Sequence, residues 1–236
     1  SGGFAILMNG LKANMIFTDP PYSVNYEKKS EEILGNGRGR GNSKISGDSL
    51  SVKDISDQIW KPCFKNLYDF ANDDCCFYIT MPQGGDQMMM MMMMSENWQV
   101  KHELIWVKSS PVFSMGRLDY DYQHEPIMYG WKNKHNFYGK GEFTKSIWQI
   151  SKPSKSELHP TMKPIALMEN ALLNSSLKDN IIVDSFIGSG STMVASHQLN
   201  RKCYGIELDP KYCQVIIDRM KKLDPTLVIK KNGTTI

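Results

Sequence analysis

The feature that most constrains the fold is a glycine turn between two apolar segments, within "NIIVDSFIGSGSTMVASHQLNRKCYGIELDP" at 180–210. The segments 180–186 and 202–208 have the composition of buried strands, and residues 191–199 between them have the pattern of a helix. Gly188 and Gly190 let the backbone turn tightly and approach a ligand closely. A strand, a tight turn, a helix and a second strand indicate an α/β domain with a mostly parallel sheet.

The same stretch predicts a ligand. The free N–H groups and the positive dipole end of the helix after the turn would point at whatever binds there. Glu207 follows Gly188 by about 20 residues, at the end of the next strand, and an acid at this position binds a ribose diol. Met193 replaces the third glycine of a dinucleotide fingerprint, so the pattern favours a nucleoside without a pyrophosphate. The alternative is a strand–helix turn that uses glycine without a ligand.

The rest of the chain continues the alternation of strands and helices. Composition predicts strands at 15–18, 75–81, 101–108, 124–131 and 145–150. Periodicity and helix-entry signals predict helices at 51–70, after Pro164, and from Asp209 to about Met220. The seven consecutive methionines Met88–Met94 favour a further helix packed on the sheet.

A second motif ends the first predicted strand, in "MIFTDPPYSVNY" at 15–26. Prolines cannot continue a strand and they remove backbone donors, so Asp19, Pro20, Pro21 and Tyr22 present a carboxylate, carbonyl oxygens and an aromatic ring with few competing N–H groups. A third motif, "HPTMKP" at 159–164, brings Thr161 and Lys163 to a helix entry, where they could hold a carboxylate. Alone, this motif is more typical of a plain helix entry.

Composition restricts the class of protein. The 236 residues carry a net charge of +3, and no apolar run approaches the roughly 20 residues that cross a bilayer, so we expect no membrane partner. The five cysteines have neither a metal-site spacing nor the even number of a disulfide framework, which predicts reduced thiols, no metal and a cytoplasmic location. The Gly/Arg-rich segment 35–44, with Arg38, Arg40 and Lys44, is either a solvated loop or a loop that contacts phosphates.

Taken in order, "DPPY" (19–22), "HPTMKP" (159–164), "DSFIGSGST" (184–192) and "GIELDPKY" (205–212) resemble the amino-group DNA methyltransferases that use S-adenosylmethionine. The order, with DPPY first and the glycine element last, resembles the permuted "beta" arrangement of that family. The resemblance reaches from about Met15 to about Met220. It implies a Rossmann-like methyltransferase fold over 1–236, with helices on both faces of a mostly parallel sheet. "TDPPY" is similar to the adenine-N6 branch rather than to the cytosine-N4 branch.

The resemblance also implies roles for single residues. The Asp19 carboxylate and the Pro20 carbonyl would accept the two hydrogens of the target amino group, Pro21 would stiffen the loop, and Tyr22 would stack on a base flipped out of the duplex. Glu207 would hold the ribose hydroxyls of S-adenosylmethionine, and Thr161 and Lys163 would lie near its methionine carboxylate. The remaining cofactor-lining residues would be Asp184, Phe186, Gly188, Gly190 and Thr192.

Target recognition in this family falls before the HPT element, so we expect a small recognition insertion at about 108–158. Basic side chains there would hold DNA phosphates, with Arg117, Lys132 and Lys134 as the candidates. The alternative for each lysine is a solvated face, and for each aromatic residue core packing. The span is short for a separate recognition domain, which favours a short target, a homodimer or a helper specificity subunit.

Other functions remain open at this point. The same fold could modify cytosine N4 or RNA, or it could be a non-catalytic nucleic-acid-binding subunit, and a nicotinamide-dependent oxidoreductase is the most distant alternative. The family usually has a Gly-Asp element before the DPPY strand, whereas "SGGFAILMNGLKAN" (1–14) has no such acid. This departure indicates either a truncated chain or an incomplete pocket for the cofactor's adenine.

Overall fold

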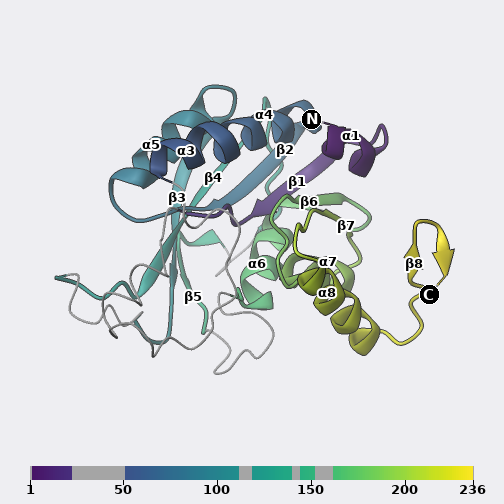
Figure 1. Cartoon of the computed structure of the whole chain (residues 1–236). Coiled ribbons are helices and arrows are strands. Elements are labelled where there is room, and N and C mark those ends of the chain that lie inside the picture. The colour runs from purple at the N-terminus through teal and green to yellow at the C-terminus, as the bar shows by residue number, and fades with distance from the viewer. Residues whose placement is uncertain (1, 23–50, 112–118, 140–143, 152–161, 236) are drawn as a thin grey trace, which may run out of the picture.

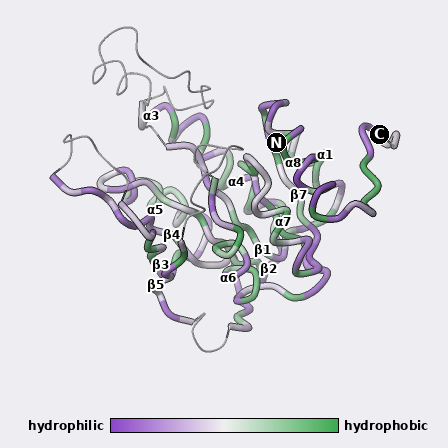
Figure 2. The backbone as a smooth tube through the Cα atoms, turned by 90° about the horizontal axis from the view of Figure 1, so that it is seen from below, coloured by the Kyte–Doolittle hydropathy of each residue, from purple (hydrophilic) through white to green (hydrophobic). Residues whose placement is uncertain are grey.

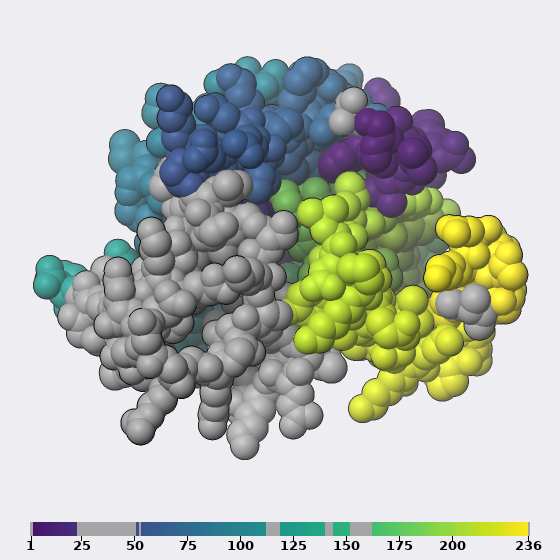
Figure 3. Space-filling view, viewed as in Figure 1, coloured from purple at the N-terminus to yellow at the C-terminus, as the bar shows by residue number. Residues whose placement is uncertain are grey.

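The computed structural model describes residues 2–22, 51–111, 119–139, 144–151 and 162–235. Its centre is a seven-stranded sheet with the order β5-β3-β4-β2-β1-β6-β7 (Figure 1). The strands of this sheet are β1 (Ala13–Thr18), β2 (Ala71–Thr80), β3 (Gln99–Val107), β4 (His124–Trp131), β5 (Ile147–Gln149), β6 (Ile181–Asp184) and β7 (Lys202–Gly205). A separate hairpin of β8 (Lys230–Lys231) and β9 (Thr234–Thr235) lies at the periphery, beyond the last helix (Figures 1 and 3).

Strand direction places several strand ends at one edge of the sheet. β1 pairs in parallel with both β2 and β6, and β6 pairs in parallel with β7. Only β4 runs against its neighbours, so its first residues lie at the edge where β2 ends, as the pairing of Thr80 with Ile127 shows. Ligands of open α/β sheets bind outside the carboxyl ends of the strands, so this edge is where a site is expected.

Helices cover both faces of the sheet (Figure 1). One face packs against α1 (Gly2–Met8), α3 (Val52–Ile55), the π-helical turn η1 (Ser56–Trp60), α4 (Lys61–Asp69) and α5 (Gly85–Ser95). The other face packs against α6 (Ile165–Ser175) and α7 (Ser191–Gln198), and α8 (Pro210–Leu223) packs on α7. Side chains alternate along β1 accordingly, because Ile16 joins the first core whereas Met15 and Phe17 join the second. The hydrophobic stretches gather around β1 and β2 in the middle of the molecule (Figure 2).

The structure confirms the α/β alternation and differs from the predicted elements in three places. Residues 51–70 form three successive helical pieces rather than one helix, with the π-helical turn η1 in the middle. The helix α1 and the β8–β9 hairpin were not predicted. The span of about 108–158, for which a recognition insertion is predicted, also contains β4 and β5 of the main sheet.

The methionine run forms most of α5, as predicted. Met90 and Met94 are fully buried against the sheet, while Met88 and Met92 are exposed on the opposite side of the helix. None of the helices that the structure describes combines the length and apolar content needed to span a bilayer. Within the same residues, no group of three or more His, Cys, Asp or Glu side chains is placed to hold a metal ion.

Candidate active site

The DPPY motif and the glycine turn lie at the ends of two neighbouring strands. Asp19 follows the last residue of β1, and the turn after Asp184 follows the last residue of β6. These strands pair in parallel, with Met15 opposite Ile182. Thr18 connects the two ends directly, because its hydroxyl donates to Asp184 Oδ1 at 2.9 Å and lies 3.1 Å from the Ser185 hydroxyl. The two motifs therefore share one edge of the sheet.

The Asp19 carboxylate already has three donors. Its Oδ1 accepts hydrogen bonds from the Thr80 hydroxyl, at the end of β2, and from the Tyr22 hydroxyl at 3.1 Å. Its Oδ2 accepts from Lys163 Nζ at 2.5 Å. The Asp19 side chain is 27% exposed, so it can meet a ligand from outside the protein. A carboxylate has about four lone-pair sites, and these three donors leave one of them on Oδ2.

Lys163 belongs to a row of alternating charges. Its ammonium lies 2.5 Å from Asp19 Oδ2 and 3.2 Å from Glu125 Oε2, and the other Glu125 oxygen lies 2.6 Å from Lys108 Nζ. Burial alone would lower the pKa of Lys163, but the Asp19 and Glu125 carboxylates outweigh that effect and raise the pKa above its usual value. Lys163 therefore stays charged, and in this structure it pairs with Asp19, the acid of the DPPY motif.

The loop after β1 is held from the helical face. Trp60, the last residue of η1, is fully buried, and its indole N–H donates to the Pro21 carbonyl at 3.0 Å. Pro20 is buried, and Tyr22 is half-buried and packs against the first core. Burial, with the neighbouring Asp19 and Glu125 charges, raises the pKa of Tyr22, so its phenol stays neutral and can donate to Asp19.

The glycine turn needs glycine for two reasons. Gly188 and Gly190 have φ of 52° and 82°, in the left-handed region that side chains disfavour. A Cβ on Gly190 would also lie 2.9 Å from Ile216 Cγ1 of α8. Gly190 immediately precedes α7, so the turn opens directly onto the first residues of a helix.

Asp184 holds this turn from inside. It is buried, and it accepts from the Thr18 hydroxyl, from Thr192 Oγ1 at 2.6 Å and from the Phe186 N–H at 3.1 Å. Burial raises the pKa of Asp184 to about 6, although these donors act in the opposite direction. The carboxylate therefore joins β1, β6 and α7. The polar atoms of Asp184 and the buried Thr192 are thus used within the protein, where they hold the glycine turn in shape.

Two further links connect the motifs. Ser191, the first residue of α7, donates from its hydroxyl to the Lys163 carbonyl at 2.9 Å, which joins the glycine element to the HPTMKP element. Glu207 lies two residues beyond the end of β7, where Oε1 accepts from the Asp209 N–H at 2.9 Å. One oxygen of Glu207 is thus used to fix its own loop.

The structure places two of the candidate DNA-binding residues, Lys132 and Lys134, in different environments. Lys132 is buried, and its ammonium donates to the Tyr68 and Ala71 carbonyls at 2.8 and 3.1 Å, so it is a structural residue, which corrects the prediction of a phosphate contact. Lys134 is exposed. The remaining candidates, Arg38, Arg40, Lys44 and Arg117, lie outside the described residues, as does Thr161.

Sequence reasoning missed four polar residues of this site: Thr18, Thr80, Lys108 and Glu125. Each stands at or just beyond the strand end nearest the site. A signal was available, because Lys108 directly follows the apolar run 104–107 and Glu125 directly precedes the apolar run 126–129. Nothing in the sequence says that these charges face one another.

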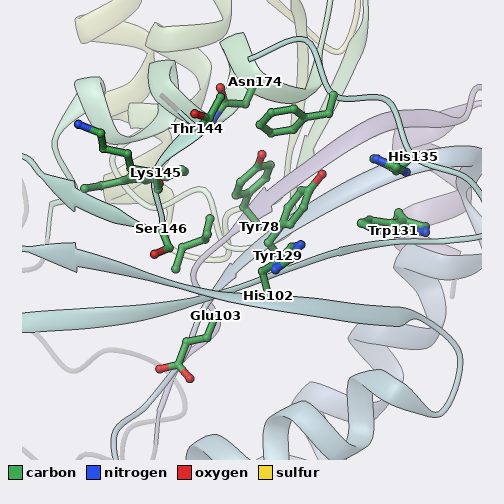
Figure 4. Close-up of a pocket in the computed structure, with 13 residues that line it drawn as sticks. Tyr78, His102, Glu103, Tyr129, Trp131, His135, Thr144, Lys145, Ser146 and Asn174 are labelled. Atoms are coloured by element: carbon green, nitrogen blue, oxygen red, sulfur yellow. The ribbon is translucent and has the colours of Figure 1, made fainter. Parts of the chain in front are cut away.

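A cavity of about 350 Å³ lies away from this site, towards the other end of β3 and β4. Its walls include Tyr78, Tyr129, Trp131 and His135, which Figure 4 shows gathered on one side of the sheet, while Glu103 points away from them. Trp131 and His135 stack with their ring centroids 4.2 Å apart. Aromatic residues from the span of the predicted insertion, among them Tyr129 and Trp131, therefore line this cavity.

Comparisons with known proteins agree with this geometry. A family model named N6_N4_Mtase and described as DNA methylase matches residues 13–218. The Type II methyltransferase M2.LlaDCHI of Lactococcus lactis subsp. cremoris is 26% identical over 235 residues, which cover 89% of this chain and 82% of that protein.

Two solved structures are similar in fold. The crystal structure of the M1.HpyAVI–SAM complex has a TM-score of 0.64 at 24% identity, covering 92% of this chain and 95% of that one. The structure of PvuII DNA methyltransferase (cytosine-N4-specific) has a TM-score of 0.67 at 15% identity, covering 95% and 85%. Both bear on the fold and confirm the predicted arrangement of a mostly parallel sheet between helices.

Proposed function

The chain belongs to the DNA methylase family, and we propose that it transfers a methyl group from S-adenosylmethionine to the exocyclic N6 amino group of adenine in DNA. The observation that supports this most is the adjacency of the two motifs. The acid and aromatic ring of Asp19 and Tyr22 follow β1, and the glycine turn follows the neighbouring parallel strand β6. A target amino group and a methyl donor bound at these two places would meet at one edge of the sheet.

The residues around the turn fit S-adenosylmethionine. The positive φ angles of Gly188 and Gly190 bend the backbone tightly at the start of α7, Phe186 offers an apolar neighbour, and the second carboxylate oxygen of Glu207 can accept from a ribose hydroxyl. Asp184 and Thr192 would hold the turn in shape. When bound, the cofactor supplies an electrophilic methyl group on a sulfonium sulfur.

Asp19 and Pro20 would prepare the amino group. The lone pair of an exocyclic amino nitrogen is delocalised into the ring, so this nitrogen is a weak nucleophile. Hydrogen bonds from its two hydrogens to the Asp19 carboxylate and the Pro20 carbonyl would favour a tetrahedral nitrogen with a localised lone pair. The nitrogen would then take the methyl group in line without a covalent enzyme intermediate, and the sulfur would leave as a neutral thioether. Asp19, which already accepts from this nitrogen, can take the proton that the methylated nitrogen must lose, and positioning with hydrogen bonding provides the rest of the catalysis.

The base must leave the duplex to reach Asp19, at a cost of a few kcal/mol in stacking and pairing. The half-buried ring of Tyr22, whose hydroxyl donates to Asp19, would stack on the flipped base. Exposed Lys134 and the basic residues Arg38, Arg40, Lys44 and Arg117 are proposed to hold phosphates. A homodimer or helper subunit for target choice, and action in the cytoplasm, are further parts of this proposal.

The second candidate is methylation of cytosine N4. The family model spans both N6 and N4 enzymes, and a fold-level neighbour is cytosine-N4-specific. The deciding experiment incubates the protein with methyl-labelled S-adenosylmethionine and unmethylated DNA, followed by digestion to nucleosides. We expect the label in N6-methyladenosine, and label in N4-methylcytosine would replace the first candidate by the second.

Asp19→Ala tests the catalytic assignment. We expect it to lower methyl transfer by at least about 100-fold, because it removes an acceptor that acts on the reacting nitrogen. Asp69→Ala is the matched control, since Asp69 is an exposed acid of α4 paired only with Lys65 in the described residues. Circular dichroism checks that both variants are folded. Full activity of folded Asp19→Ala would exclude the proposed role.

A further inference from the structure

The row of charges at the site contains a second acid for which the proposed chemistry has no role. Glu125 is the second residue of β4, and its side chain is 18% exposed. One of its oxygens lies 3.2 Å from Lys163 Nζ and the other 2.6 Å from Lys108 Nζ. The ammonium of Lys163 is thus shared between two carboxylates, Asp19 and Glu125, that come from different strands.

This sharing matters because Lys163 competes with the substrate. A charged ammonium is a stronger donor to a carboxylate than a neutral amino group is. Lys163 occupies Asp19 Oδ2 at 2.5 Å, whereas Thr80 and Tyr22 occupy Oδ1, so a target amino group must use the remaining part of Oδ2. A stronger hold of Lys163 on Asp19 would weaken the acceptor that the amino group needs.

We propose that Glu125 is a positioning residue that draws Lys163 partly away from Asp19 and takes over its ammonium when the target amino group binds. The inference rests on the proposed function of Asp19. Lys163 would not become unpaired during this exchange, because Glu125 is already within 3.2 Å of the same nitrogen. Lys108, buried and 2.6 Å from Glu125, would keep that carboxylate oriented toward the site.

The charge balance supports the exchange. Asp19, Lys163, Glu125 and Lys108 form a row of two anions and two cations, so moving Lys163 along the row changes which acid it neutralises and leaves the total charge unchanged. Breaking a buried ion pair by removing one partner is costly, whereas exchanging partners within a row avoids an uncompensated charge. The pKa of Lys163, raised by both carboxylates, keeps the ammonium charged throughout.

Glu125→Gln tests the proposal because it keeps the shape of the side chain and removes its charge. Lys163 should then stay on Asp19, and we expect kcat for methyl transfer to fall about 10- to 100-fold, the loss expected for one charged hydrogen bond. The affinity for S-adenosylmethionine should change by less than about 2-fold in direct binding. Glu125→Asp should recover part of the rate. Glu103→Gln, which removes an exposed charge from β3, is the matched control and should behave as wild type.

The double variant with Lys163→Met distinguishes this role from a structural one. If Glu125 acts through Lys163, Glu125→Gln should change kcat by less than about 2-fold in the Lys163→Met background. Independent, multiplying effects would overturn the proposal, as would a Glu125→Gln variant with the wild-type rate. A wild-type protein that transfers no methyl group would reject the proposed function together with this inference. If the wild-type protein transfers methyl groups and Glu125→Gln does so at the same rate, the inference is rejected and the proposed function stands.

Discussion

Replacing Asp184 by asparagine tests what holds the glycine turn. The buried carboxylate accepts from the hydroxyls of Thr18 and Thr192 and from the Phe186 N–H. Asparagine has the same shape, and its carbonyl oxygen can still accept from Thr18 and Phe186, while the Thr192 hydroxyl can turn to accept from the new amide. We therefore expect Asp184→Asn to fold and to preserve the turn, in contrast to Asp184→Ala, which leaves three donors without their acceptor.

The burial of Asp184 determines how strongly the free energy of unfolding should depend on pH. Burial raises the pKa of Asp184 from 3.8 to about 6, so between these values the folded protein binds more protons at this site than the unfolded chain does. The free energy of unfolding must then fall as pH rises through this window. At about 1.36 kcal/mol for each pKa unit, the loss above pH 6 is roughly 3 kcal/mol. Asp184→Asn has no ionisable group at the site and should lack this loss.

Urea unfolding from about pH 3.5 to 7.5 covers this window and measures the difference directly. Comparing each variant with wild type at every pH cancels the contributions of the other acids. Wild type should lose stability relative to Asp184→Asn as pH rises, and Asp218→Asn, an exposed acid on α8, should follow wild type. If Asp184→Asn and wild type show parallel curves, the carboxylate does not pay a burial penalty and the reasoning is wrong.

Two more predictions concern the turn and the basic residues. Gly190→Ala should destabilise the protein by about 2 kcal/mol or more and weaken S-adenosylmethionine binding in calorimetry, because it combines a φ of 82° with a contact at 2.9 Å to Ile216. Gly84→Ala is the control, because Gly84 has a φ of 74° but open space around its Cβ, so this variant measures the backbone cost without the steric contact. Equal losses of stability in the two variants would contradict the packing argument. Lys132→Met should lower stability by about 1–3 kcal/mol without changing the salt dependence of DNA binding. Lys134→Met should leave stability unchanged and reduce the slope of log K for DNA binding against log salt concentration by about 1. An unchanged slope would exclude Lys134 from the proposed DNA contacts.

The sequence predicts the elements of this fold well where a signal is local. The strand 124–131 was predicted with the observed bounds, and the helix after the glycine turn ends one residue before its predicted end. Pro210 and Asp209 mark the start of α8, where the Asp209 side chain accepts from the Lys211 N–H. Such signals depend on neighbouring residues, so periodicity and capping reveal them.

The contacts that build the site are different in kind. Thr18 and Asp184 are 166 residues apart, and Lys163 and Asp19 are 144 apart, so their pairing follows only from the strand order. The sequence identifies Lys132 and Lys163 as basic residues, yet one is buried on backbone carbonyls and the other on carboxylates. Charge alone does not distinguish a surface lysine from a buried one, because burial depends on which strands become neighbours.

Asp19 and Asp184 have identical side chains at the ends of adjacent strands, but their different neighbours give them different roles. Asp184 is surrounded by neutral donors and buried, so its raised pKa marks a group whose charge the fold disfavours and whose bonds serve the turn. Asp19 is partly exposed and pairs with a cation that a second acid also holds. Only the second arrangement leaves an acceptor open to a ligand and a cation that can move aside. The role of each carboxylate therefore depends on its hydrogen-bonding and charged partners. Giving Asp184 a cationic partner and Asp19 only neutral donors should exchange their two roles.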